Sequence, residues 1–365
     1  MHIFEFVKGW SVELFLFYFI IAVVFSFLCS KGVNKGKKGK LYFVIGFFLL
    51  WFFQTFRSIN VGVDTEDYVN YFYDFCKYGW GATDLYANRE LLFNVHLYLI
   101  SRLSHSYTVL FAANALITNV ALIIFINQFF KKHDSFVMLP LFVLNYIYDM
   151  AAMRSSLAVA FVLVAFVLLD KRKYIYCVLF SIVAFLFHNT TLVAFIIIMY
   201  RLFLLHNNDR VKGRTLFIST LAVAISIHLS VAGLQSALME TKYSGYAEEL
   251  SSGWFGIWNL VVAFILSVYL MVRNRKRRQP FNTFDVVNVV AFALCPVIVQ
   301  LGAYRLAKYF LMFRIMTYKT YFTELEQKND AKLIVAFECV VMLLGLLFYM
   351  GRLGASLPYE FAPLF

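Results

Sequence analysis

Charged residues are scarce in this sequence: they make up 15% of 365 residues, and Asp and Glu together number 21. Soluble globular chains average about 25% charged residues, so the composition excludes an ordinary water-soluble protein. Five cysteines are present, and most lie in apolar runs, which gives no disulfide framework. No P-loop, GxGxxG, HExxH, CxxC or GxSxG pattern occurs. The sequence therefore predicts no cofactor, no metal centre and no nucleic-acid partner.

Apolar residues dominate instead, at 62% of the chain, with 42 phenylalanines and 23 tyrosines. Because a membrane-crossing helix needs about 20 apolar residues, we predict an all-α fold, a polytopic transmembrane bundle of about twelve spans. It forms a single integral membrane domain over residues 1–365. The expected spans lie near 10–29, 41–56, 107–127, 135–150, 153–169, 174–188, 190–205, 215–234, 256–272, 285–301, 304–322 and 332–350.

Basic clusters indicate how these spans are oriented. Most lysines and arginines fall in short loops on one side of a strict alternation, at 31–40, 131–132, 171–173, 201–214, 273–278 and 319–332. By the positive-inside rule this side is the cytoplasm. Both termini, a loop over 57–106 and a second loop over 235–255 then face outward. Within the first loop, segment 91–103 is too short to cross a membrane and is typical of an amphipathic interfacial or re-entrant helix.

A second set of lysines and arginines runs against the positive-inside rule, because its members lie within spans or at their outer ends. An ionisable group at membrane depth costs about 2.5–3.5 kcal/mol on insertion scales, so such groups indicate a ligand or a partner. Arginine suits phosphate and carboxylate recognition. We therefore expect a polyanion to be bound by Arg57, Arg154, Arg305, Lys308 and Arg314.

Each of these assignments has a plain structural alternative. Arg57 could extend toward the interface, and Lys308 and Arg314 could do the same. Arg154 lies among small residues that favour close helix packing, so it requires either Asp149 or a ligand phosphate as its partner. We favour the ligand.

Three outer-face residues are candidate proton acceptors: Asp64, Glu90 and His188. Asp64 follows a glycine turn, but it could simply cap a helix beginning at Thr65. Glu90 opens the apolar helix 91–103, where it could favour the helix dipole. His188 lies between two apolar runs and could be a packing residue, a general base or a donor to phosphate.

Several short motifs, in order, resemble the EpsG-like branch of the Wzy polysaccharide polymerases. They are R-x4-G-x-D-T-x2-Y from Arg57 to Tyr68, the glutamate at Glu90, M-R-S-S-L-A from Met153, F-H-N-T-T from Phe187, Y-R-L-A-K-Y around Arg305, and L-P-Y-E-F from Leu357. The family more often has glutamine directly after the arginine of the fifth span, where this chain has Ser155.

This resemblance implies a bacterial inner-membrane glycosyltransferase with a GT-C-like bundle. It would join oligosaccharide repeat units carried on undecaprenyl pyrophosphate into O-antigen or a similar surface polysaccharide on the periplasmic side. No cofactor is implied. The suggested partners are these lipid-linked oligosaccharides, membrane lipid, a chain-length regulator of the Wzz type and a flippase. An O-antigen ligase and a lipid-linked glycan transporter are the alternatives.

Within that reaction the roles can be divided by charge. Arginines lower the pKa of a nearby carboxyl group, which weakens it as a base. We therefore expect His188 to accept the proton, while Asp64 orients either the acceptor sugar or His188.

The orientation can be tested by cysteine accessibility in a background that lacks the five native cysteines. A cysteine at position 36 should resist an impermeant reagent added from outside, because the loop 31–40 is cytoplasmic. A cysteine at position 66 should react with it. Labelling of position 36 from outside would contradict the predicted topology.

Overall fold

The structure is a computed structural model, and it describes residues 12–33, 36–62, 64–86, 90–130, 150, 152–191, 194–195, 198–199, 201–202, 359 and 361–362. The chain divides into two compact units, one of which is Met1–Thr191 together with Tyr318–Phe365. All elements named below belong to this unit. Its described residues are helical, apart from turns and one isolated antiparallel bridge between Arg57 and Phe361.

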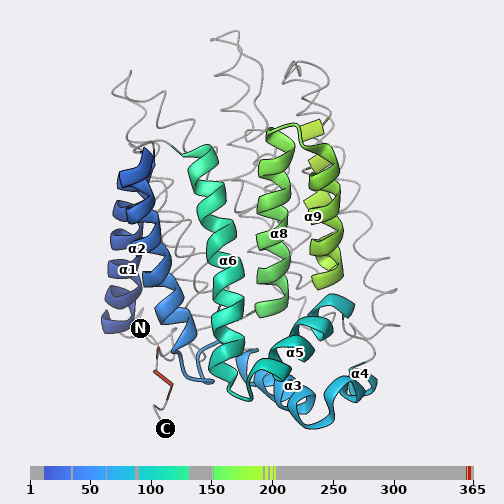
Figure 1. Ribbon diagram of the computed structural model, residues 1–365. Coiled ribbons are helices and arrows are strands. Elements are labelled where there is room, and N and C mark those ends of the chain that lie inside the picture. Colours follow the sequence, from blue (N-terminus) through green and yellow to red (C-terminus); the bar gives the residue numbers. More distant parts are fainter. Residues whose placement is uncertain are drawn as a thin grey trace, which may run out of the picture. The chain divides into compact units, whose positions relative to one another are not determined.

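Five helices pack in a row in chain order, as Figure 1 shows: α1 to α2, α2 to α6, α6 to α8, and α8 to α9. Their bounds are Val12–Gly32 (α1), Gly36–Thr55 (α2), Tyr107–Phe129 (α6), Met153–Asp170 (α8) and Tyr174–Phe187 (α9). A tight turn at Lys171–Lys173 joins α8 to α9, and Arg172 has the left-handed φ of 57° there. The row therefore puts the start of α8 and the end of α9 at the same end of the bundle.

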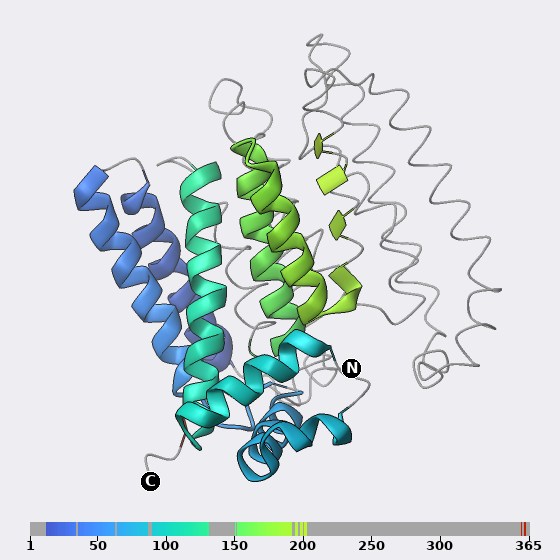
Figure 2. The same cartoon turned by 45° about the vertical axis from the view of Figure 1, so that its right-hand side comes forward.

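Short helices lie across that end, below α6, α8 and α9 in Figures 1 and 2. They are α3 (Thr65–Tyr78), the 3₁₀ turn η2 (Gly79–Gly81), α4 (Ala82–Leu85) and α5 (Leu91–Leu103). We call them the cap helices. A turn at Gly62, whose φ of 105° suits glycine, leads from α2 into α3. Another 3₁₀ turn, η3 (Asn189–Thr191), follows α9.

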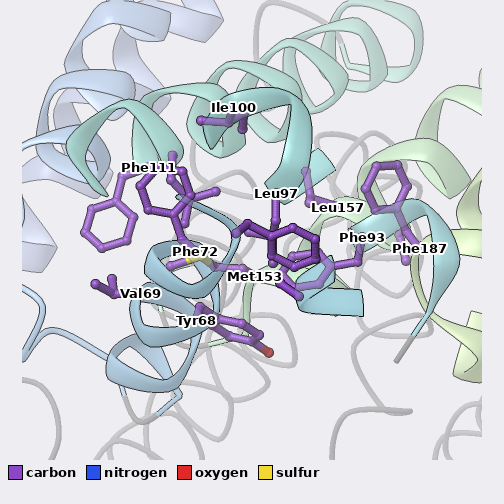
Figure 3. Packing of buried hydrophobic residues seen from close by; sticks show 14 residues of the cluster. Tyr68, Val69, Phe72, Phe93, Leu97, Ile100, Phe111, Met153, Leu157 and Phe187 are labelled. Atoms are coloured by element: carbon purple, nitrogen blue, oxygen red, sulfur yellow. The ribbon is translucent and has the colours of Figure 1, made fainter. Parts of the chain in front are cut away.

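An apolar cluster fastens the cap helices to the bundle (Figure 3). In α3 the residues Tyr68, Phe72 and Phe75 recur at helical spacing and are at most 2% exposed. They pack against the buried faces of α5, α6, α8 and α9, through Phe93, Leu97, Phe111, Met153, Leu157 and Phe187. Deeply buried aromatic side chains of this size contribute strongly to packing, so the cluster fixes where the ends of α8 and α9 stand relative to α5.

Buried polar side chains tie the long helices to one another in pairs. Asn119 of α6 donates to the Gln54 side chain of α2 at 2.8 Å, and the Trp51 indole of α2 donates to the Ala112 carbonyl of α6 at 3.0 Å. Gln128 of α6 donates to Asp170 of α8 at 3.0 Å. Such pairing offsets the cost of taking polar groups out of water.

The described helices confirm the predicted segments near 10–29, 41–56, 107–127, 153–169 and 174–188, and α5 coincides with the predicted helix 91–103. By length and apolar composition, two helices of the described residues could cross a membrane, α6 and α8. The predicted span near 135–150, apart from Met150, and those from 215 to 350 lie outside the described residues, as does loop 235–255. The predicted span near 190–205 is described only in part.

Candidate active site

Three helix ends bring Glu90, Arg154 and His188 together. Glu90 immediately precedes α5, Arg154 is the second residue of α8, and His188 directly follows α9. One Glu90 oxygen, Oε2, accepts from Arg154 Nη1 at 2.7 Å, and the other, Oε1, lies 2.6 Å from His188 Nδ1. All three side chains are between 9% and 13% exposed.

The backbone and nearby rings hold this group in place. Both Glu90 and His188 have extended backbones, so each side chain leaves its helix axis where the helix begins or ends. Thr191 donates to the His188 carbonyl through its backbone at 3.0 Å and its hydroxyl at 2.6 Å. The guanidinium carbon of Arg154 lies 5.9 Å from the Tyr68 ring centre and 6.0 Å from that of Phe93, within the range of cation–π attraction.

The Glu90 carboxyl group is held in its ionised form. Burial by itself raises its pKa, but the hydrogen bond from His188 and the charge of Arg154 outweigh burial and lower the pKa to about 2. A carboxylate with so low a pKa is a weak base at neutral pH. Such a carboxylate is suited to orienting a neighbouring donor and to stabilising positive charge.

The His188 ring is oriented by this carboxylate. An ionised carboxylate only accepts hydrogen bonds, so Nδ1 carries the hydrogen and donates to Glu90. In the neutral imidazole the other nitrogen, Nε2, then has a lone pair. Among the described residues Nε2 is buried and has no hydrogen-bond partner. In this tautomer Nε2 can accept a hydrogen bond or a proton.

Arg154 was expected to pair with Asp149 or with a ligand phosphate; in the structure its partner is Glu90. Asp149 lies outside the described residues. The pairing was missed because Glu90 is 64 residues away in sequence. A signal existed, since a buried arginine requires an acid and Glu90 directly precedes the apolar helix α5 at this end of the bundle.

Arg57 does not join this group. It is 3% exposed, and its Nη1 and Nη2 donate to the backbone carbonyls of Gln54 and Met150 at 2.8 and 3.1 Å. Its guanidinium carbon lies 4.2 Å from the centre of the Phe111 ring. Each terminal nitrogen thus gives one of its two N–H groups to a backbone carbonyl, and the binding of an anion by Arg57 stays a prediction.

The remaining candidates are placed only in part. Asp64 directly precedes α3, which begins at Thr65 as predicted, but the Asp64 side chain makes no capping hydrogen bond. Its backbone carbonyl accepts from the amide of Tyr68, which ends the first sequence motif. The Tyr68 ring contacts Arg154, which the sequence did not predict. The predicted cations Arg305, Lys308 and Arg314 lie outside the described residues.

Comparisons with known proteins agree on one relationship. A family model described as the EpsG family matches residues 40–361. The amylovoran biosynthesis protein AmsC of Erwinia amylovora is 23% identical over 294 residues, which cover 74% of this chain and 76% of that protein. No solved structure matches the chain.

The pKa of Glu90 predicts how stability depends on pH. A carboxyl group whose pKa falls on folding, here from 4.5 to about 2, stabilises the native state above pH 4.5 and loses this contribution as the pH falls toward 2. The difference corresponds to on the order of 3 kcal/mol. The thermal unfolding temperature of the purified protein should therefore fall on acidification through this window, and Glu90→Gln should flatten the fall.

Glu66→Gln is the matched control, because Glu66 is exposed on the first turn of α3. This variant should keep the wild-type dependence on pH. An equally steep fall in Glu90→Gln and in wild type would show that Glu90 is not the group that titrates.

Proposed function

Because the chain belongs to the EpsG family, we propose that it is a polymerase of polysaccharide biosynthesis. Its relative from Erwinia amylovora is named as a biosynthesis protein of amylovoran, which supports a role in making a polysaccharide. The substrates would be oligosaccharide repeat units on undecaprenyl pyrophosphate, and the product O-antigen or a similar surface glycan. The reaction would take place on the periplasmic side of a bacterial inner membrane, within a GT-C-like bundle of many spans.

The observation that carries this proposal is the Glu90 carboxylate shared by His188 and Arg154. In the reaction, a hydroxyl oxygen of the acceptor sugar bonds to the anomeric carbon of the donor glycan. The bond from that carbon to the pyrophosphate oxygen breaks, and lipid pyrophosphate leaves with the bonding electrons. The hydroxyl proton goes to Nε2 of His188.

Glu90 has two roles in this step. It keeps the hydrogen on Nδ1, so that the lone pair of Nε2 is available, and it stabilises the imidazolium that forms when Nε2 takes the proton. Glu90 rather than Asp64 is therefore the residue that orients His188. Asp64 remains a candidate for orienting the acceptor sugar, because it lies one helical turn before Tyr68 at the same end of the bundle.

Arg154 keeps Glu90 ionised and brings positive charge to the place where the leaving group develops its negative charge. The other cations predicted from the sequence, Arg305, Lys308 and Arg314, are the proposed ligands of the pyrophosphate itself. Fixed charges that are already in position stabilise a leaving phosphate without reorganisation during the reaction.

Replacement of His188 tests the proposal directly. In a reaction with purified protein and lipid-linked repeat units, wild type should produce a ladder of glycan lengths. His188→Ala should lower turnover by about 10²–10⁴-fold, because a positioned general base contributes that much. His105→Ala is the matched control: His105 is exposed beyond the end of α5 and should leave turnover unchanged.

Other outcomes identify other functions. Near-normal turnover of a stably folded His188→Ala, with loss of turnover in Glu90→Gln or Asp64→Asn, would make that carboxylate the proton acceptor. Transfer of glycan only to a lipid A core acceptor would identify a ligase. Movement of intact lipid-linked units across a vesicle membrane, without any ladder, would identify a transporter.

A further inference from the structure

The C-terminal end of α2 is completed by residues from the far end of the chain. The last carbonyls of a helix lack partners within the helix. The Phe53 carbonyl accepts from the Tyr359 hydroxyl at 2.9 Å, and the nearby Phe56 carbonyl accepts from the Ala362 amide at 2.8 Å. Some 306 residues separate Tyr359 from Phe53, so this contact is a feature of the tertiary fold.

Aromatic contacts hold the same segment against α1 and α2. The Tyr359 ring lies 4.8 Å from Phe17 of α1 and 5.7 Å from Phe53 of α2, between ring centres. The Phe361 ring lies 6.2 Å from Phe52 and 6.3 Å from Phe53. Burial raises the pKa of Tyr359, so its hydroxyl group remains a donor at neutral pH. We call Tyr359, Phe361 and Ala362 the tail segment.

The tail segment pairs with the backbone of Arg57 itself, through an antiparallel bridge between Arg57 and Phe361. The side chain of Arg57 then reaches from the end of α2 to the carbonyl of Met150, just before α8. The same carbonyl accepts from the Thr65 hydroxyl at 3.0 Å. Met150 is fully buried, and it precedes Arg154 by four residues.

A continuous set of contacts therefore runs from the tail segment through Arg57 and Met150 to the start of α8, where Arg154 meets Glu90. We propose that Arg57 and the tail segment are positioning residues, which hold the first turn of α8 so that Arg154 stays bound to Glu90. This inference rests on the proposed function for its effect on catalysis, but not for its effect on the Glu90 pair.

The values of kcat and KM distinguish a positioning role from a substrate-binding role. A residue that binds pyrophosphate in the ground state changes KM when it is lost. A residue that only aligns the catalytic groups lowers kcat and leaves KM nearly unchanged. Small displacements of catalytic groups cost up to about 10²-fold in rate.

The test uses the full chain with Ala362→Pro, which removes the N–H donor to Phe56, fixes φ at position 362 and restricts the backbone of Phe361. Ala362→Ser is the matched control, because it keeps the N–H. A second pair of variants is Tyr359→Phe, which removes only the hydroxyl donor, and a chain ending at residue 358. Each protein is measured for glycan turnover and for the fall in unfolding temperature on acidification.

We expect Ala362→Pro and the shortened chain to lower kcat by about tenfold or more with KM within about twofold. Their fall in stability on acidification should be less steep than that of wild type, because Glu90 loses the charge of Arg154, which helps to lower its pKa, and keeps the hydrogen bond from His188. Tyr359→Phe should show a smaller effect of the same kind, and Ala362→Ser should match wild type.

Unchanged kcat together with the wild-type dependence of stability on pH would overturn the positioning role. A raised KM with unchanged kcat would also overturn it, in favour of ligand binding by Arg57. If wild type makes no glycan ladder but the dependence on pH flattens as expected, the positioning role stands and the proposed function fails.

Discussion

The Glu90 carboxylate joins α5, α8 and α9, because one of its oxygens accepts from Arg154 and the other from His188. Charges removed from water are costly unless they are paired and hydrogen-bonded. Loss of Glu90 would take this partner from both Arg154 and His188, and loss of either of these would take the partner of one Glu90 oxygen, where each side chain is at most 13% exposed. The interaction that orders these helix ends thus also fixes the direction of the imidazole on which the proposed chemistry depends.

Apolar packing determines how accurately the site residues are placed. Met153 and Phe187 belong to the buried cluster, and each directly precedes a site residue, Arg154 or His188. Two polar contacts help to hold Met153 in place: His96 of α5 lies 2.7 Å from Asn114, and Asn114 donates to the sulfur of Met153. The His96 ring also contacts Phe187. The rigid cluster therefore controls how accurately the charged groups meet.

Hydropathy and helical spacing predicted the long helices and α5, because burial of apolar faces decides where helices form. They did not predict α4, and α3 was indicated only by the alternative in which Asp64 caps a helix. They also singled out Glu90, Arg154 and His188, whose residue types stand out in apolar surroundings. The pairing among them could not be predicted, because it depends on how helix ends 64 and 98 residues apart meet. The role of Arg57 was hidden for another reason: its acceptors are backbone carbonyls, which no residue type marks.

The most direct test is the tautomer of the neutral His188 ring, measured by ¹⁵N NMR of histidine-labelled protein, with the His188→Ala spectrum used for assignment. For the neutral ring we expect a hydrogen-bonded N–H at Nδ1 and a lone pair at Nε2, and we expect Glu90→Gln to shift the Nδ1 signal. A hydrogen on Nε2 with a bare Nδ1, or a spectrum unchanged by Glu90→Gln, would contradict this expectation.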